Sequence, residues 1–134
     1  MMSKESLVTL QQAVDERRSV YALGNELPVE PQAIVNMAER VLLHTPSAFN
    51  SQSSRLVVLF GAEHQQLWDI AEEKLRAAVG DGDFSGSKQK LDGFRAAAGT
   101  VLFYEDKNVT QSLQEQFALY ADRFPVWAQQ TSAM

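Results

Sequence analysis

The sequence contains no cysteine. That absence excludes disulfide bonds, thiolate nucleophiles, iron–sulfur clusters and zinc sites built on cysteine. Any redox chemistry would therefore have to come from a bound cofactor. The two histidines, His44 and His64, lie in different predicted elements with no carboxylate at metal-ligand spacing, so we expect surface or helix-end roles for them and no metal site.

Long apolar runs and an excess of basic residues are also missing. No apolar stretch approaches the roughly 18 residues of a membrane span. The opening MMSKESLVTL lacks the apolar core and cleavage site of a secretion signal. The formal net charge of −5 argues against a general nucleic-acid binder, because backbone affinity depends on basic residues. We therefore expect a cytoplasmic protein that binds neither nucleic acid nor membrane.

The composition is otherwise ordinary, with 45% apolar and 22% charged residues. A chain of 134 residues fits one domain, 1–134, which is large enough to bury about two thirds of its unfolded surface. Helical spacing of apolar residues predicts helices at 4–17, from Pro31 until Pro46, at 63–79, 88–97 and 109–121, and after Pro125. Four aromatic residues on these helical faces are predicted to pack in the core: Trp68, Phe94, Phe117 and Trp127.

Two short apolar runs, LVVLF at 56–60 and TVLFY at 100–104, predict strands that are covered on both faces. Two such strands cannot form a stable sheet alone, since a lone pair leaves long hydrophobic edges open. A second subunit must complete the sheet, or the chain must continue. The last helix stops at Met134 without a C-terminal signal, which favours continuation.

The first polar cluster is Arg17-Arg18-Ser19, at the end of the first predicted helix. Two arginines and a serine hydroxyl offer forked donors for a phosphate or for the carbonyl edge of a heterocycle. The alternative is a structural role, because basic residues in the last turn of a helix complement the helix dipole. The cluster alone does not decide between an anion clamp and this structural role.

The second polar cluster is the uncharged stretch PSAFNSQ, Pro46 to Gln52. Its hydroxyl and carboxamide groups can both donate and accept hydrogen bonds, which suits a uracil-like ring or a ribityl chain. The alternative is a helix stop whose polar side chains satisfy the turn backbone. A third stretch, DGDFSG at 81–86, matches the opening of a calcium-binding loop, but Asp92 stands where glutamate is expected and Lys88 intrudes, so a plain connecting loop is favoured.

In chain order, six blocks resemble the nitroreductase superfamily: ERRSVYAL at 16–23, HTPSAFNSQSSR at 44–55, VVLFGAEH at 57–64, KLDGFRA at 90–96, GTVLFYED at 99–106 and FPVWAQQTSAM at 124–134. The resemblance is closest to its fatty-acid-repression-mutant-like subgroup. It implies an α+β fold with a mixed or antiparallel β-sheet flanked by helices. It also implies an intertwined homodimer that binds flavin mononucleotide (FMN) at the subunit interface.

By the same resemblance, Arg17, Arg18 and Ser19 contact the phosphate, ribityl chain and pyrimidine edge of the flavin. Pro46, Ser47 and Asn50 match the block that reaches the flavin of the other subunit, and Gln52 completes that motif. The family's chains are longer, so Met134 would fall inside a central helix and the domain would be incomplete at its C-terminus. Val20-Tyr21 and Ala97-Ala98 depart from the family pattern.

The implied activity is that of a flavoprotein oxidoreductase. NAD(P)H would reduce the flavin, and a nitroaromatic or quinone-like acceptor would then take the electrons in a ping-pong cycle. No acid–base residue is assigned to this reaction. Two alternatives stay open: a catalytically inactive dimeric flavin-binding or structural module, and a calcium-sensing helical module.

Overall fold

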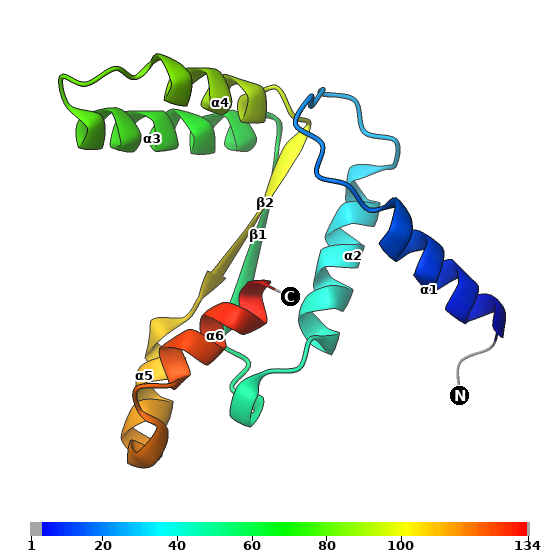
Figure 1. Cartoon of the computed structure of the whole chain (residues 1–134), viewed down its shortest axis with the longest axis vertical. Helices are drawn as coiled ribbons and strands as arrows, with labels where there is room; N and C mark the ends of the chain where they lie inside the picture. Colours follow the sequence, from blue (N-terminus) through cyan, green and yellow to red (C-terminus); the bar gives the residue numbers. More distant parts are fainter. Residues whose placement is uncertain (1–3, 134) are drawn as a thin grey trace.

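The chain forms two strands and six α-helices within residues 4–133, which are the residues that the computed structural model describes. Figure 1 shows them in chain order, with two short 3-10 turns, η1 (Ala48–Asn50) and η2 (Ala118–Tyr120). The strands are β1 (Ser54–Phe60) and β2 (Gly99–Glu105). The helices are α1 (Lys4–Glu16), α2 (Pro31–His44), α3 (Gly61–Val79), α4 (Ser85–Arg95), α5 (Lys107–Gln116) and α6 (Phe124–Ala133).

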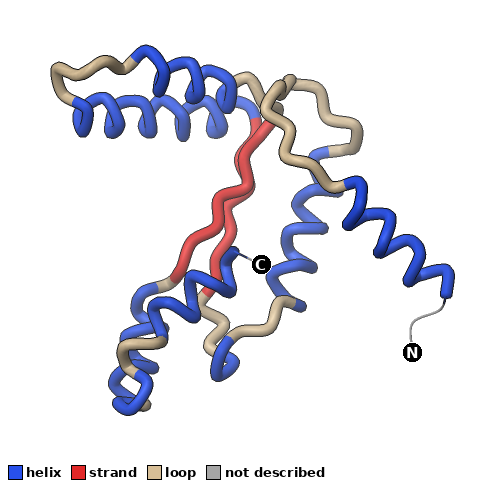
Figure 2. The backbone as a smooth tube through the Cα atoms, in the orientation of Figure 1, coloured by secondary structure: helices blue, strands red, loops and turns tan. Residues whose placement is uncertain are grey.

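β1 and β2 pair antiparallel, from Ser54 opposite Glu105 to Phe60 opposite Gly99. Gly99 is required in this register, because a Cβ there would lie 2.6 Å from the carbonyl oxygen of Leu59. The two strands form a narrow ribbon with helices at its ends and along one side (Figure 2). This arrangement confirms the α+β fold class and both predicted strands.

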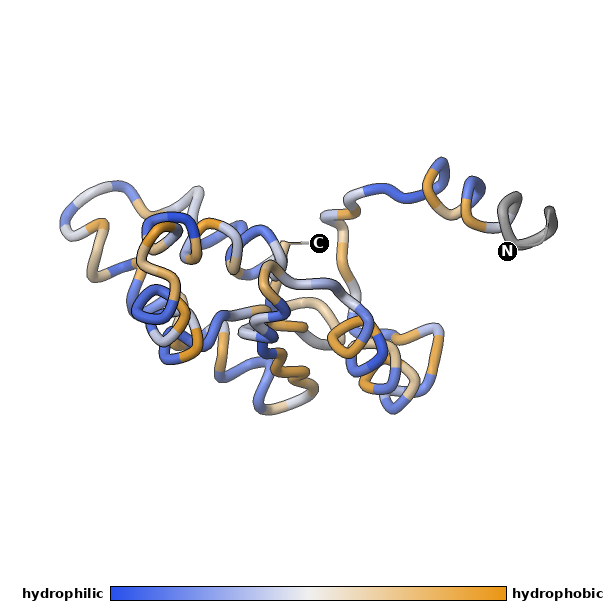
Figure 3. Tube along the Cα trace, turned by 90° about the horizontal axis from the view of Figure 1, so that it is seen from below, coloured by the Kyte–Doolittle hydropathy of each residue, from blue (hydrophilic) through white to orange (hydrophobic). Residues whose placement is uncertain are grey.

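The connection between the strands is a helical hairpin, α3 and α4, which projects beyond one end of the ribbon (Figure 1). α5 and α6 lie at the other end, whereas α2 lies beside the ribbon. α1 and the segment that follows it extend away from the rest of the chain (Figure 3). None of the helices in residues 4–133 is both long and apolar enough to cross a membrane.

The predicted helices are present, with two corrections. The helix predicted to run to residue 121 ends earlier, because α5 stops at Gln116. The backbone of the next residue, Phe117, is non-helical (φ −125°, ψ 66°). α4 begins at Ser85, three residues before the predicted start. The helix starts there because the Asp83 carboxylate accepts the Ser85 N–H at 2.9 Å, and this hydrogen bond lowers the pKa of Asp83.

The early start of α4 also decides the calcium alternative. Residues 85–92, which would form the second part of a calcium loop, lie in the helix. Lys88 pairs there with Asp92 at 3.0 Å, the residue that would supply the last ligand. The stretch is therefore a short connector between two helices.

The chain is much more open than its size requires. Its accessible surface is 10,398 Å², against about 7,000 Å² for a compact folded protein of this mass. The expected burial of two thirds of the unfolded surface is therefore not reached, because no layer covers the two-stranded ribbon on both faces. The prediction of fully covered strands is wrong for this single chain: Leu102, Phe103 and Tyr104 are 40%, 50% and 46% exposed.

Candidate functional site

A cavity of about 420 Å³ lies where the end of α2 meets the start of β1. Its walls come from α2, from the turn after it, from β1 and from α6. The lining residues include four of those singled out in the sequence, Pro46, Ser47, Asn50 and Gln52. They also include residues that the sequence did not point to: Leu42, Leu43, His44, Thr45, Ser54, Arg55 and Thr131.

The turn that carries these polar groups has an unusual backbone. α2 ends at His44, and Pro46 cannot continue it because proline has no N–H to donate. Phe49, Asn50 and Gln52 then adopt φ of 55°, 50° and 50°, in the left-handed region that few non-glycine residues occupy. Such conformations persist where surrounding contacts hold them, and they cluster at functional sites.

Phe49 is the contact that ties this turn to the rest of the chain. Its ring lies 5.1 Å from Phe117 and 5.3 Å from Phe124, measured between centroids, and it stacks on Trp127 at 5.9 Å with an interplanar angle of 19°. Tyr120 completes this aromatic cluster at 5.7 Å. Phe117 and Trp127 therefore pack in an aromatic cluster, although both are only partly buried, and this packing explains an aromatic residue inside a polar loop.

Hydrogen bonds within the turn leave part of its polar groups free. The Ser47 hydroxyl oxygen accepts the Gln52 N–H at 3.0 Å, so its own hydrogen can still be donated. The Gln52 side-chain amide donates to Asn50 Oδ1 at 3.3 Å. Asn50 Nδ2 and Gln52 Oε1 take part in none of the hydrogen bonds of the described residues. The Asn50 amide group, the Gln52 side-chain carbonyl and the hydrogen of the Ser47 hydroxyl are therefore available to a ligand of this cavity.

Arg55 is the strongest charge on the cavity wall. Its guanidinium donates to Asp106 at 3.0 Å and to the backbone carbonyls of Gln52 and Ser54 at 2.9 and 3.0 Å. No sequence pattern singles Arg55 out, although it lies three residues after the polar loop. Because no carboxylate lines the cavity, the guanidinium of Arg55 favours an electron-rich ligand there, in a chain of net charge −5.

The Glu105 carboxylate joins three serines next to the cavity. Glu105, at the end of β2, accepts hydroxyl hydrogen bonds from Ser53, Ser54 and Ser132. Ser54 also contacts the Ser132 hydroxyl at 3.1 Å. Ser53 is fully buried. These bonds join β1, β2 and α6 beside Ser54 and Thr131, which line the cavity.

Arg17, Arg18 and Ser19 lie elsewhere. All three are exposed on the segment that leaves α1, and none lines the cavity of their own chain. The Arg18 guanidinium donates to the carbonyls of Asp15 and Arg17 at 2.6 and 2.7 Å, so within one chain it caps the end of α1. The single chain therefore does not bring the two predicted polar clusters together (Figure 1).

The two histidines differ in their surroundings. His44 is exposed at the end of α2, as expected, but His64 is buried in the first turn of α3 with 1% exposure. Its Nε2 faces the carbonyl of Arg95 at 3.1 Å and must therefore carry hydrogen, so Nδ1 accepts the Thr100 hydroxyl at 2.9 Å. Of the surface and helix-end roles predicted for the histidines, the surface role is wrong for His64, which lies in the first turn of α3 with its imidazole bridging α3, α4 and β2.

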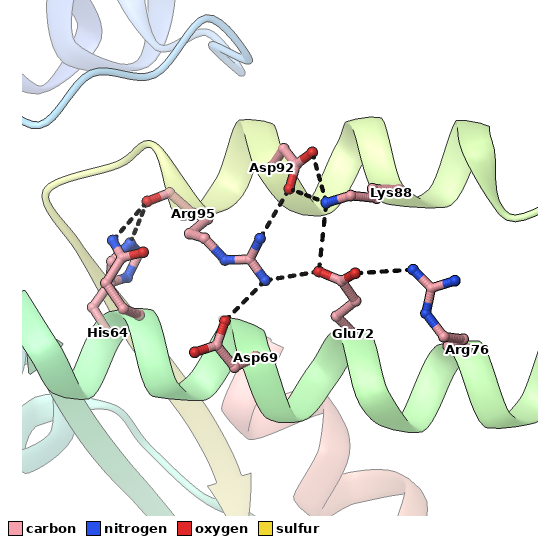
Figure 4. Close-up of polar contacts among 8 residues, drawn as sticks. His64, Asp69, Glu72, Arg76, Lys88, Asp92 and Arg95 are labelled. Atoms are coloured by element: carbon pink, nitrogen blue, oxygen red, sulfur yellow. Dashed lines mark hydrogen bonds and ion pairs between the residues drawn. The ribbon is translucent and has the colours of Figure 1, made fainter.

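A second set of polar residues holds the α3–α4 hairpin together (Figure 4). Glu72 binds Arg95 at 2.9 Å and Arg76 at 3.1 Å, and these hydrogen bonds lower the pKa of Glu72. Glu72 and Asp69 in turn raise the pKa of Arg95. Nothing in this network faces a cavity described above. Within the described residues, no group of three or more potential metal ligands is found.

The turn and the cavity can be compared with known proteins. Residues 14–134 match the Nitroreductase family. This match covers the turn, the cavity wall and all but the start of the chain. The chain belongs to the nitroreductase family. Members of this family are oxidoreductases and generally use flavin cofactors.

Individual relatives agree with this membership. Protein HBN1 of Saccharomyces cerevisiae is 33% identical over 129 residues, which cover 95% of this chain and 64% of HBN1. Nitroreductase CinD of Lactococcus lactis, in complex with chloramphenicol, superposes with a TM-score of 0.78 at 42% identity, over 92% of this chain and 62% of CinD. A nitroreductase structure from S. cerevisiae gives a TM-score of 0.81 at 30% identity, over 93% and 68% of the two chains. The chain thus spans less than two thirds of HBN1 and of CinD.

Proposed function

We propose that this chain is an FMN-dependent oxidoreductase that uses NAD(P)H to reduce nitroaromatic or quinone-like acceptors in a ping-pong cycle. Family membership supports the oxidoreductase class and a flavin. CinD has been crystallised with chloramphenicol and with 4-nitrophenol, both of which carry a nitro group on a benzene ring. The observation that carries the proposal is the cavity at Pro46–Gln52, because its free groups match the needs of such a cofactor.

The lining of the cavity fits a flavin in size and chemistry. Its volume of about 420 Å³ lies within the usual 300–1,000 Å³ of ligand pockets. Free donor and acceptor groups on Ser47, Asn50 and Gln52 suit a heterocycle whose edge both donates and accepts. Arg55, which is paired with Asp106 outside the lining, adds a guanidinium donor, and no carboxylate lines the cavity itself. When bound, FMN would supply the hydride and electron transfer that no side chain here provides.

In this proposal the residues of the chain bind and orient. Pro46, Ser47 and Asn50 hold the cofactor, and Gln52 orients the Asn50 carboxamide through their 3.3 Å hydrogen bond. Arg17, Arg18 and Ser19 of a second copy donate to the phosphate, the ribityl chain and the pyrimidine edge. An arginine beside that edge would stabilise negative charge there. No residue is assigned an acid–base role.

The open surface supports a homodimer in which two copies share each site. Each chain exposes about 3,400 Å² more than a compact chain of its mass, which exceeds the roughly 1,000–2,500 Å² that each partner buries in a permanent dimer interface. Arg17 and Arg18 stand on the exposed N-terminal segment, so they are free to reach another copy. Each copy forms a single domain. A cytoplasmic location belongs to the same proposal and is checked by cell fractionation.

Absorbance spectroscopy tests the cofactor and the reaction separately. The purified protein, incubated with FMN and desalted, should retain the yellow flavin spectrum, and NAD(P)H should bleach it without oxygen. Adding 4-nitrophenol or a quinone should then restore the colour. Bound flavin that NAD(P)H never bleaches would instead support an inactive flavin-binding module, and a colourless protein would refute the proposal.

A mixing experiment tests the shared site. One variant carries Arg17→Gln and Arg18→Gln, and the other carries Asn50→Ala; each alone should lose FMN. In a hybrid dimer, one site would combine all the substitutions and the other would have none. Mixing the two variants should therefore restore FMN binding. If wild-type proteins exchange subunits on mixing but the two mixed variants still bind no FMN, each site is built from a single chain.

A further inference from the structure

We propose that Phe49 is a positioning residue for the cavity: its ring, anchored in the aromatic cluster of Phe117, Tyr120, Phe124 and Trp127, holds the Pro46–Gln52 turn in the shape that binds a ligand. This inference rests on the proposed function for the identity of the ligand. It makes the shape of the cavity depend on four aromatic residues that do not line it.

The first argument comes from the backbone. A phenylalanine at φ 55° and ψ 23° is disfavoured, because its Cβ crowds the backbone, and Asn50 and Gln52 beside it are left-handed as well. The turn has few bonds of its own to maintain this shape. They are the N–H groups of Asn50, Ser51 and Gln52, which donate to Ser47 O, Ala48 O and Ser47 Oγ at 3.0, 3.1 and 3.0 Å, and the side-chain bond from Gln52 to Asn50 at 3.3 Å.

The second argument comes from the ring. The ring of Phe49 reaches α6, where it stacks on Trp127 and meets the edge of Phe124. Phe124 is buried with 2% exposure, so this end of the anchor is fixed. The next residue, Asn50, lies on the cavity wall. A rotation of the Phe49 backbone that releases the ring therefore also moves the Asn50 carboxamide.

The affinity for a ligand depends on how many molecules hold the turn in its binding shape. If only a fraction of the molecules retain that shape, the apparent affinity is reduced in proportion to that fraction. A substitution that removes the Phe49 ring but keeps a Cβ leaves the left-handed backbone strained and takes away the packing that compensates this strain. It should therefore weaken FMN binding roughly tenfold. The overall fold should persist, because Phe49 is half exposed.

The test compares substitutions at Phe49 with a matched control. Phe49→Ala removes the ring and keeps the strain, Phe49→Gly removes both, and Phe49→Tyr restores the ring. The control is Phe94→Ala in the α3–α4 hairpin, because Phe94 packs on Trp68 at 5.1 Å, the same centroid distance as Phe49 to Phe117. Two quantities are measured: the dissociation constant of FMN, and the amide hydrogen exchange of the peptide covering residues 46–55.

Phe49→Ala should bind FMN about tenfold more weakly and exchange faster over 46–55. Phe49→Gly loses the anchor but not the fit to a left-handed position, so it should fall between Phe49→Ala and the wild type in both measurements, whereas Phe49→Tyr and Phe94→Ala should match the wild type. Three results would overturn the inference: unchanged exchange in Phe49→Ala, wild-type behaviour of Phe49→Gly, or an equal effect of Phe94→Ala. If the wild type binds no FMN, the proposed function fails. The exchange measurement on the FMN-free protein still decides the role of Phe49.

Discussion

The α3–α4 hairpin and the Pro46–Gln52 turn both combine a packed aromatic ring with polar side chains. They differ in how completely those polar side chains find partners within the chain. In the hairpin, Glu72 and Arg95 pair with each other and with neighbouring charges, and Trp68 packs on Phe94. Arg95 Nε is the buried polar atom that lacks a partner in the described residues. In the turn, the ring of Phe49 is packed, but the amide and hydroxyl groups beside it keep donors and acceptors free.

This difference separates stabilising residues from candidate binding residues without reference to other proteins. Buried polar groups that find partners within the chain contribute to folding. Polar groups held on a fixed backbone without partners are available to a ligand. Substitutions in the hairpin should therefore change stability and leave FMN affinity alone, and those around the cavity should do the reverse.

The largest expected effect is on the hairpin side, at His64. Its imidazole is buried and hydrogen-bonded to Thr100 and to the Arg95 carbonyl. Replacing His64 with alanine creates a cavity and removes the acceptor of the Thr100 hydroxyl, while the Arg95 carbonyl keeps only the Gln65 side-chain amide as a donor, so the free energy of unfolding should fall by about 2–4 kcal/mol. Urea denaturation measures this loss. FMN affinity, measured on the folded fraction, should stay at the wild-type value.

His44 provides the matched control on the cavity side. It is exposed at the end of α2, so His44→Ala should change the unfolding free energy by no more than about 0.5 kcal/mol. If the two alanine variants are destabilised equally, burial does not distinguish the two histidines, and the contrast between the regions is lost.

A smaller effect, this time on binding, is expected at Arg55. Arg55→Gln removes the guanidinium from the cavity wall and should weaken FMN binding about tenfold, the size of one hydrogen bond to a charged group. The unfolding free energy should change by less than about 1 kcal/mol, because the pair with Asp106 is partly exposed. Arg76→Gln, which breaks an exposed pair in the hairpin, is the control and should bind FMN normally. Normal binding by Arg55→Gln would remove Arg55 from the site.

Local patterns in the sequence predicted most of the elements. The runs LVVLF and TVLFY lie within β1 and β2, and Pro31 and Pro46 bracket α2. The break in α5 at Phe117 was not predicted, because helical spacing continues through it and only packing against Phe49 and Phe124 shows where that ring goes. Tertiary contacts override local pattern at this point.

The candidate site was predictable in part. Pro46, Ser47, Asn50 and Gln52 attract attention as an uncharged polar loop after a helix, and all four line one cavity. Arg55 was missed because a single arginine at the start of a strand carries no pattern; its position depends on Asp106, which is distant in sequence. The assignment of Arg17, Arg18 and Ser19 to the same site remains a prediction, since it needs a second copy of the chain.

The smallest effect is a pH dependence in the hairpin, at Glu72. Hydrogen bonds from Arg95 and Arg76, together with the charge of Lys88, lower its pKa from the ordinary value of 4.5. A carboxyl with a lowered folded-state pKa stabilises the protein above its unfolded pKa, and this contribution is lost as the pH falls through the folded value. Glu72→Gln should therefore lower the melting temperature at pH 7 slightly. It should also make the decline of melting temperature below about pH 4.5 shallower than in the wild type.

Glu73 is the control for this measurement because it is the next residue on α3 and is 76% exposed, against 19% for the side chain of Glu72. It lies near Lys74 alone, so Glu73→Gln should keep the wild-type slope between pH 6 and pH 3, apart from a small uniform offset. Melting curves of the three proteins across that range give the comparison. Equal slopes for both variants would mean that the ion pairs between α3 and α4 do not form in solution. The hairpin would then be held by its apolar contacts, which are those of Trp68 with Phe94 and those of the buried Phe84 and Leu91.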